Sequence, residues 1–198
     1  LEHIIERCRQ QNINCIAVAD HGTTDGAFKL KSIAPFPVII AEEILTPWGE
    51  IMGMFLSETV PTKIPVDEAI KRIKDQNALV CIPHPGDRAR SSAFTIGNLS
   101  AIQSDVDIIE VFNARNHAHN GNGRALETAQ KYHKLCSAGS DAHTINEIGG
   151  VFIEMKEFNS VEEFKASLKE GKITGRVSSP LVHVSSAASR FAKAFLKH

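Results

Sequence analysis

Apolar positions follow two alternating patterns along this chain, and together they predict strands and helices in turn. Short continuous apolar runs are typical of strands buried on both faces of a parallel sheet, whereas apolar residues spaced three and four apart indicate one face of a helix. The runs predict strands over 14–20, 37–45, 78–84, 107–113, 134–141 and 150–158. The spacings predict helices over 1–11, 65–77, 123–133, 160–169 and 185–197.

One hairpin interrupts this alternation. The turn Thr46-Pro47-Trp48-Gly49 follows the second expected strand, and 50–56 has the pattern of an antiparallel partner. The other strand and helix units repeat in the order that favours an α/β fold with a mainly parallel sheet, either doubly wound or closed into a barrel.

Composition narrows the class of protein. The chain has 198 residues, of which 42% are hydrophobic, and a formal net charge of -1. These values suit one domain over 1–198 and give no electrostatic bias toward nucleic acid or membrane. No apolar run is long enough to span a bilayer, and no extended nucleic-acid track is evident. Four widely spaced cysteines predict reduced core thiols in a cytoplasmic protein; they are Cys8, Cys15, Cys81 and Cys136.

Histidine and carboxylate side chains stand at the ends of several expected strands. Asp141 and His143 lie two residues apart, so in an extended segment both side chains point the same way. His84 stands between two prolines, which fix its backbone. Of the neighbours Glu42 and Glu43, only one can face a common site, because adjacent side chains on a strand point to opposite faces.

These residue types together predict a metal site. Imidazoles and carboxylates without thiolates suit Mn, Fe or Zn in a catalytic site rather than a structural zinc. Ligands that come from successive strands converge only if the strand ends surround one centre, as at the mouth of a (β/α) barrel. Taken singly, each residue also fits an ordinary loop, cap or solvated position, so the prediction depends on the set. The candidate metal ligands are His21, Glu43, His84, Asp141 and His143.

Four motifs resemble those of a known family, in the same order. They are Ala19-Asp20-His21-Gly22, Ala41-Glu42-Glu43-Ile44, Pro83-His84-Pro85-Gly86 and Gly139-Ser140-Asp141-Ala142-His143. Jointly they resemble the PHP (polymerase and histidinol phosphatase) superfamily. The resemblance implies a distorted seven-stranded (β/α) barrel with two or three divalent ions, Mn, Fe or Zn, at its mouth, and a phosphoesterase that uses a metal-activated water.

The resemblance also implies roles for individual residues. The five candidate ligands fall on ligand positions of the family, with Asp141 and His143 as catalytic residues. Asp20 would orient a ligand imidazole from outside the metal shell. Asn113 stands where many relatives carry a histidine, so Asn113 and the nearby His117 are candidates for an additional ligand.

The chain departs from the family pattern at its beginning. The His-x-His motif of the first strand has no counterpart, and the sequence opens on a helical pattern without an initiator Met. We therefore expect that this chain is N-terminally truncated and that its first barrel strand precedes Leu1. Such a form should hold fewer ions than an intact relative and have little or no activity.

Arginines that follow the strand ends are expected to bind the substrate, because a guanidinium pairs with phosphate bidentately. The candidates are Arg88 and Arg115, with Arg90 a weaker one. The expected substrate is a small phosphomonoester or a nucleotide end.

Two other classes of protein stay open at this point. A metal-dependent amidohydrolase would be favoured by a lysine at a strand end that serves as a carbamylated bridge, and no expected strand ends in lysine. The second alternative is a catalytically decayed PHP domain that acts as a metal-binding or interaction module.

Overall fold

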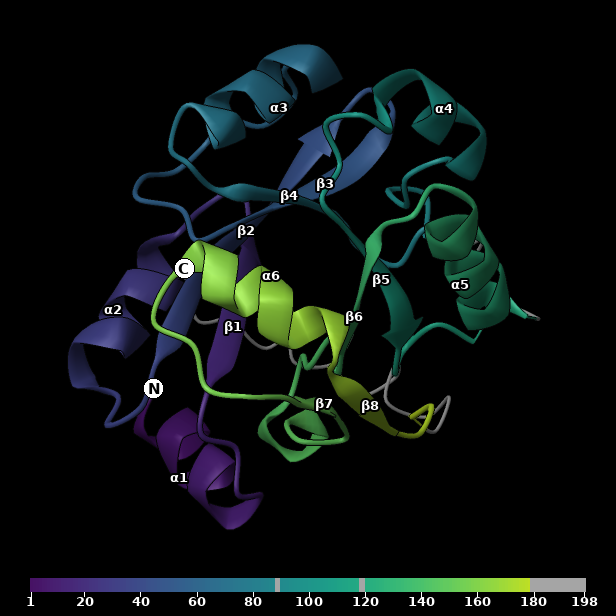
Figure 1. The fold of residues 1–198 in the computed structure, drawn as a ribbon. Coiled ribbons are helices and arrows are strands. Elements are labelled where there is room, and N and C mark those ends of the chain that lie inside the picture. Colours follow the sequence, from purple (N-terminus) through teal and green to yellow (C-terminus); the bar gives the residue numbers. More distant parts are fainter. Residues whose placement is uncertain (88–89, 118–119, 179–198) are drawn as a thin grey trace, which may run out of the picture.

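A curled six-stranded sheet forms the framework of the structure, a computed structural model that describes residues 1–87, 90–117 and 120–178 (Figure 1). Its strands lie side by side in chain order, from β1 to β6. They are β1 (Ile16–His21), β2 (Val38–Thr46), β3 (Gly49–Met54), β4 (Leu79–Ile82), β5 (Ile108–Asn113) and β6 (Leu135–Gly139).

One strand runs against the others. β3 is antiparallel to both β2 and β4, while β1 pairs with β2, and β4 with β5 and β6, in parallel. The reversal follows from the two-residue connection between Thr46 and Gly49, because so short a link can join only antiparallel strands. The predicted hairpin is confirmed.

Six α-helices and a second, two-stranded sheet complete the described residues. The helices are α1 (Glu2–Gln10), α2 (Asp25–Ile33), α3 (Val66–Lys74), α4 (Leu99–Ile102), α5 (Gly121–Lys131) and α6 (Val161–Lys169). The small antiparallel sheet consists of β7 (Val151–Glu154) and β8 (Lys172–Gly175), and short 3-10 helices cover η1 (Ile96–Asn98) and η2 (Ile145–Glu147).

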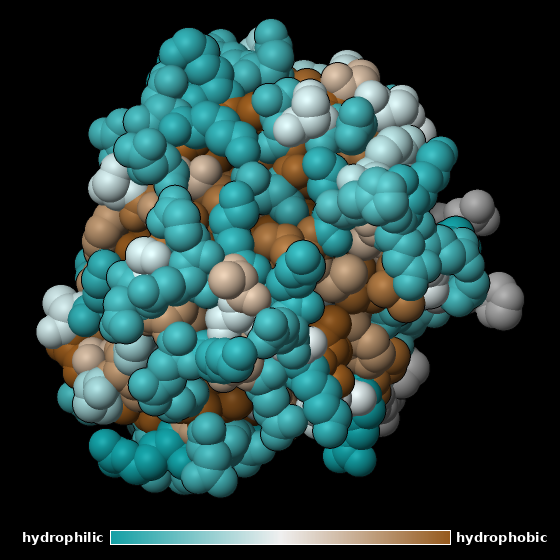
Figure 2. Space-filling model, viewed as in Figure 1, coloured by the Kyte–Doolittle hydropathy of each residue, from teal (hydrophilic) through white to brown (hydrophobic). Residues whose placement is uncertain are grey.

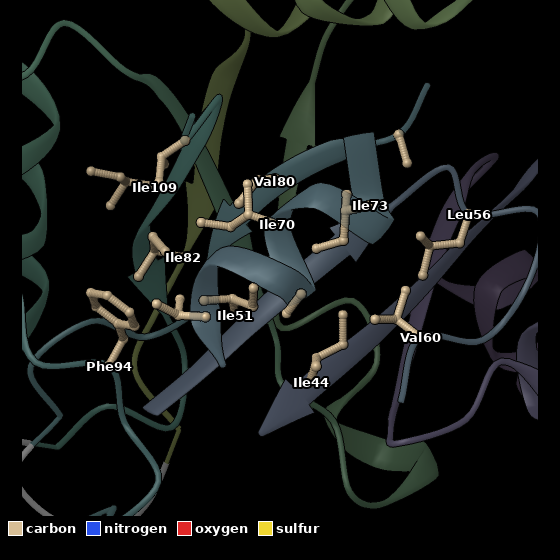
Figure 3. Packing of buried hydrophobic residues seen from close by; sticks show 14 of the residues in the cluster. Ile44, Ile51, Leu56, Val60, Ile70, Ile73, Val80, Ile82, Phe94 and Ile109 are labelled. Carbon is tan, nitrogen blue, oxygen red and sulfur yellow. The ribbon is translucent and has the colours of Figure 1, made fainter. Parts of the chain in front are cut away.

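The outer face of the curled sheet carries the larger apolar cluster. Alternate residues of the strands pack there against α2, α3, α4 and α5. Figure 3 shows this packing around α3, whose Ile70 and Ile73 lie against Val80 and Ile82 of β4. The helix predicted over 65–77 is observed as α3, and all four of its apolar residues are buried: Val66, Ala69, Ile70 and Ile73.

The inner face of the sheet is divided into an apolar and a polar part. Helix α6 lies across the open side of the curl (Figure 1), where Phe164 and Leu168 cover Ile39, Met54 and Ile108. Two further rings, Phe55 and Phe158, contact Phe164 edge to face, with centroids 4.9 and 5.0 Å away. On the outside of this layer, hydrophilic residues cover most of the visible surface (Figure 2).

The main departures from the predicted elements are short or weakly patterned segments. α2 was not predicted, because its sequence, Asp25 to Ile33, contains a glycine and an incomplete apolar face. β7 ends at Glu154 rather than at 158, and β8 was not predicted. The expected helix over 185–197 lies outside the described residues. Six strands in one curled sheet agree with the predicted α/β fold, while the closed seven-stranded barrel stays a prediction.

All four cysteines are free thiols, and Cys8 and Cys81 are buried. In the part of the chain that the structure describes, no helix combines the length and the apolar character needed to cross a membrane.

The contact between α6 and the sheet can be tested by removing one ring. Phe164 is 4% exposed, so Phe164→Ala should lower the free energy of unfolding by about 3–5 kcal/mol through lost burial and a cavity. Urea denaturation followed by circular dichroism measures the change. The matched control is Phe28→Ala on α2, where Phe28 is 39% exposed. Equal losses of unfolding free energy in both variants would contradict the role of Phe164 in covering the inner face of the sheet.

Candidate metal centre

Three side chains from three adjacent strands meet on the polar part of the inner face. The register of β1 and β2 places His21 beside Glu43. His21 Nδ1 lies 3.1 Å from Glu43 Oε2 and 3.1 Å from Glu50 Oε1 on β3. Each residue offers one ligand atom, and these atoms lie within 4.8 Å of one another, a spacing suited to a metal ion.

His84 extends this group from the chain that follows β4. It is 1% exposed, and its Nε2 lies 3.4 Å from Glu43 Oε1 and 3.8 Å from Glu50 Oε2. Neither ring nitrogen makes a hydrogen bond of good geometry to any described residue. A buried polar group without such a bond is costly, and a divalent ion between the imidazole and the carboxylates would satisfy it. The donor set therefore fits a metal ion.

Glu110 of β5 fixes the backbone of His84. His84 has a φ of 31°, outside the usual range for residues with a side chain. Its N–H donates to Glu110 Oε2 at 2.7 Å, and Asn113 Nδ2 donates to the same oxygen at 2.9 Å. One carboxylate thus holds the start of the His84 loop and the end of β5 together.

Asp141 and His143 lie beyond the end of β6, on a segment that joins the site through Arg90. The Arg90 guanidinium forms an ion pair with Asp141, and its Nε donates to Asp87 Oδ2 at 3.2 Å. His143 Nδ1 lies 2.9 Å from the carbonyl oxygen of Asp141. A carbonyl only accepts, so Nδ1 carries the proton and Nε2 keeps the lone pair that a metal ion needs.

Glu147 anchors the loop that carries His143. Its Oε2 accepts the N–H of His143 at 3.1 Å and that of Thr144 at 2.9 Å, and its Oε1 accepts from Arg115 at 2.8 Å. Both charged groups of the Arg115–Glu147 pair are buried. The pair connects the segment after β5 to the loop after β6, and so fixes the position of His143 relative to the end of the sheet.

The close carboxylates shift the acid–base properties of both histidines. The hydrogen bond to Glu50 raises the pKa of His21, with a smaller contribution from Glu43, against the opposing effect of burial. Burial lowers the pKa of His84, but the carboxylates of Glu43 and Glu110 outweigh it, and the net shift is upward. Burial raises the pKa of Glu110 to about 7.

The remaining predicted residues lie at different distances from this centre. Glu43 faces it, while Glu42 is fully buried on the opposite face, where its Oε2 accepts the Val60 N–H at 2.8 Å. The Asp20 carboxylate lies against Gly26 at the start of α2, where a Cβ would come within 2.2 Å of Oδ2. Among the described residues, Asp20 forms no hydrogen bond or ion pair with an imidazole of the centre, so its orienting role stays a prediction.

Other candidates belong to the loops after β4 and β5. Both ends of the Asn113 amide are engaged, since Oδ1 accepts the Arg115 N–H at 2.9 Å and Nδ2 donates to Glu110. His117 is half-buried between β5 and α5. Arg88 lies outside the described residues. Metal binding by Asn113 and His117 and substrate binding by Arg88 and Arg115 stay predictions.

Glu50 and Glu110 were not among the predicted site residues, and Arg90, a weaker candidate than Arg88 and Arg115, forms an ion pair with Asp141. A signal for Glu50 was present, because the hairpin places residues of 50–56 opposite the strand that carries Glu43. Glu110 lies within an expected strand, two residues from Ile108 and so on the same face, and only the sheet order brings it to His84.

Comparisons with known proteins agree with this architecture. The family described as PHP-associated matches residues 119–173. The protein MJ0417 of Methanocaldococcus jannaschii, itself uncharacterized, is 37% identical over 166 residues, which are 82% of this chain and 66% of that protein. The chain thus spans just under two thirds of this relative.

Three solved structures share the fold at low identity. PsfC from Pseudomonas syringae superposes with a TM-score of 0.70 at 14% identity, over 96% of this chain and 88% of its own. A two-domain protein from Bacteroides vulgatus, which contains a predicted PHP-like metal-dependent phosphoesterase, gives 0.66 at 16%, over 88% and 59%. An amidohydrolase from Chromobacterium violaceum, with bound sulfate and no metal, gives 0.58 at 14%, over 70% and 80%. The match of residues 119–173 to the PHP-associated family and the fold shared with a PHP-like structure agree with the resemblance of the motifs to the PHP superfamily.

Metal binding to this centre should strengthen as the pH rises. A histidine must lose its proton before it can bind a metal ion, and the pKa of both His21 and His84 lies above the ordinary value of 6.5. Protons therefore compete with the metal below and just above pH 6.5. Isothermal titration with Zn²⁺ between about pH 6 and 8 should show tighter binding and fewer released protons at the higher pH.

Two variants test whether His21 is responsible for the pH dependence of metal binding. His21→Gln should weaken binding and flatten its pH dependence, whereas His3→Gln, at an exposed position of α1, should leave both unchanged. An affinity that does not vary with pH in the parent protein would contradict the assignment.

The role of Glu110 can be separated from that of a ligand. Glu110→Leu removes the acceptor for the His84 N–H, so Zn²⁺ affinity should fall by about 10- to 100-fold. Glu110→Gln keeps an acceptor oxygen and should retain most of the affinity. If Gln were as damaging as Leu in calorimetric titration, the charge of Glu110 would be needed directly and the positioning role would be wrong.

Proposed function

We propose that this protein is a metal-dependent phosphoesterase that hydrolyses a small phosphomonoester or a nucleotide-end phosphate. The observation that carries the proposal is the meeting of His21, Glu43 and Glu50 within ligand distance, beside the buried imidazole of His84. The match of residues 119–173 to the PHP-associated family supports it, as does the fold shared with the Bacteroides vulgatus protein, which contains a predicted PHP-like metal-dependent phosphoesterase.

His21, Glu43, Glu50 and His84 form the proposed ligand set on the sheet, and Asp141 and His143 complete it from the loop after β6. Two or three divalent ions, Mn, Fe or Zn, are proposed, because nitrogen and carboxylate donors suit these metals. Bound in this way, such ions supply Lewis acidity toward phosphate oxygens and make an activated water available near neutral pH. Completion of a seven-stranded barrel around the site belongs to the same proposal.

Among the arginines that the structure describes, Arg90 is the one best placed to bind the phosphate. It already contacts Asp141, and its planar guanidinium can pair with two phosphate oxygens at once. Arg115 is engaged with Glu147 and more directly positions the His143 loop. The sulfate in the Chromobacterium violaceum structure is an anion of the same shape as phosphate, which supports anion binding in this fold.

An amidohydrolase is the second candidate, favoured by the fold of that same structure. Against it, none of the six strands of the described main sheet ends in a lysine that could form a carbamylated bridge. A decayed, non-enzymatic module would bind metal without turnover. Metal analysis together with assays on phosphomonoesters, nucleotides and amide substrates separates these three classes.

Asp141→Asn tests the catalytic assignment. The change removes a negative charge beyond the end of β6, so it should lower phosphoester turnover at least about 100-fold. It removes no packed apolar side chain, so it should shift thermal stability little. The experiment compares turnover at saturating Mn²⁺ and thermal melting with those of the parent. Asp105→Asn, at an exposed site after α4, is the matched control. Undiminished turnover in Asp141→Asn would exclude Asp141 as a catalytic residue.

A further inference from the structure

The β2–β3 hairpin extends beyond the metal centre and ends in an exposed tryptophan. The register pairs Leu45 with Glu50, and Thr46 with Gly49, so one residue pair separates Glu50 from the two-residue turn. Trp48 occupies that turn, two residues from Glu50. Leu45 and Trp48 are each 36% exposed, whereas the other apolar side chains of β2 are buried.

The tip of the hairpin is held firmly. The Trp48 N–H donates to Thr46 Oγ1 at 3.2 Å, and its carbonyl oxygen accepts the Thr95 N–H at 3.3 Å. Behind it, Gly49 has a φ of 108° and lies so close to Phe94 that a Cβ would come within 2.5 Å of the Phe94 Cα. The backbone that presents Trp48 is therefore ordered before any ligand binds.

The same loop connects the tip to a residue of the metal centre. The Glu50 N–H donates to the Ser92 carbonyl oxygen at 2.7 Å, and Ser92 Oγ donates to Glu50 Oε2 at 2.8 Å. The positions of Glu50 and Trp48 are thus fixed relative to each other by one set of hydrogen bonds. Two residues of chain span at most roughly 7 Å, a length that one sugar ring covers between a phosphate and a base.

Leu45 lies on the same face as the metal centre. Side chains two apart on a strand share a face, so Leu45 follows Glu43 toward the mouth and lies opposite Glu50. An apolar side chain there adds to the surface that a planar ring can contact. Aromatic stacking on an exposed tryptophan accepts any nucleobase, because every base has a π-face.

We propose that Trp48, with Leu45 beside it, binds the nucleobase of a nucleoside monophosphate or nucleotide end while the phosphate lies at the metal centre. This inference rests on the proposed function and names its substrate class. Phosphomonoesters that lack a base, such as sugar phosphates, lose this contact and are the poorer substrates.

Fluorescence gives a direct test of the contact. Trp48 is the single tryptophan of the sequence, so the intrinsic emission reports on this residue alone. With Zn²⁺ present, adenosine 5′-monophosphate should quench and shift the emission in a saturable way, and ribose 5-phosphate should leave it nearly unchanged. Absence of any response to adenosine 5′-monophosphate would overturn the inference.

Kinetics give the second test. Trp48→Ala should lower the ratio of kcat/KM for adenosine 5′-monophosphate to that for ribose 5-phosphate by about 5- to 100-fold, mainly through KM. Trp48→Phe keeps a ring and should restore most of the ratio. Phe28→Ala, which removes an exposed ring from α2, is the control for general surface effects.

The outcomes separate this inference from the proposed function. An equal loss toward both substrates in Trp48→Ala would mean that Trp48 supports the metal centre and does not select the base, which overturns the inference. If the parent protein hydrolyses neither phosphoester, the proposed function fails, while the fluorescence titration still decides whether Trp48 contacts a base.

Discussion

Mutual repulsion among buried carboxylates is the constraint on which this site depends. Glu43, Glu50 and Glu110 come from three different strands and are all buried. Carboxylates in such a place are tolerated only when cations or protons balance them. In the structure the balance comes from His21, from His84 and from the upward shift in the pKa of Glu110. A divalent ion placed among the same oxygen atoms would balance them more completely than protons do.

The inner face of the sheet has an apolar part and a polar part, and this division explains why the carboxylate charge is concentrated at one end of the strands. Toward the beginning of the parallel strands, Phe164 and Leu168 of α6 cover the sheet with apolar side chains and exclude water. Toward their ends, the same alternating positions carry acidic residues and histidines. Ile39, Ala41 and Glu43 belong to one face of β2, so a single strand passes from the sealed core to the metal centre within five residues.

Much of this arrangement could be predicted from local sequence, and the remainder depended on distant pairing. Continuous apolar runs located five strands of the main sheet and the hairpin turn located β3, while strand alternation required that only one of Glu42 and Glu43 face the site. The contribution of Glu110 could not be read in this way, because it arises from the parallel pairing of β4 with β5, which brings the carboxylate to the His84 backbone. Arg90 reaches Asp141 across 51 residues of sequence, a contact that no local pattern encodes.

The reversed strand β3 determines how Glu50 reaches the candidate metal centre. In an all-parallel sheet, each strand end would deliver its ligand and continue into a loop toward the outer helices. Because β3 returns directly from the tip of β2, it brings Glu50 to the centre from the opposite chain direction and leaves Trp48 in the turn between the two strands. The backbone bonds from Ser92 and Thr95 hold both ends of this short segment. A change in the hairpin therefore affects Glu50 and the exposed ring of Trp48 together, and under the proposal this coupling relates metal binding to the choice of substrate.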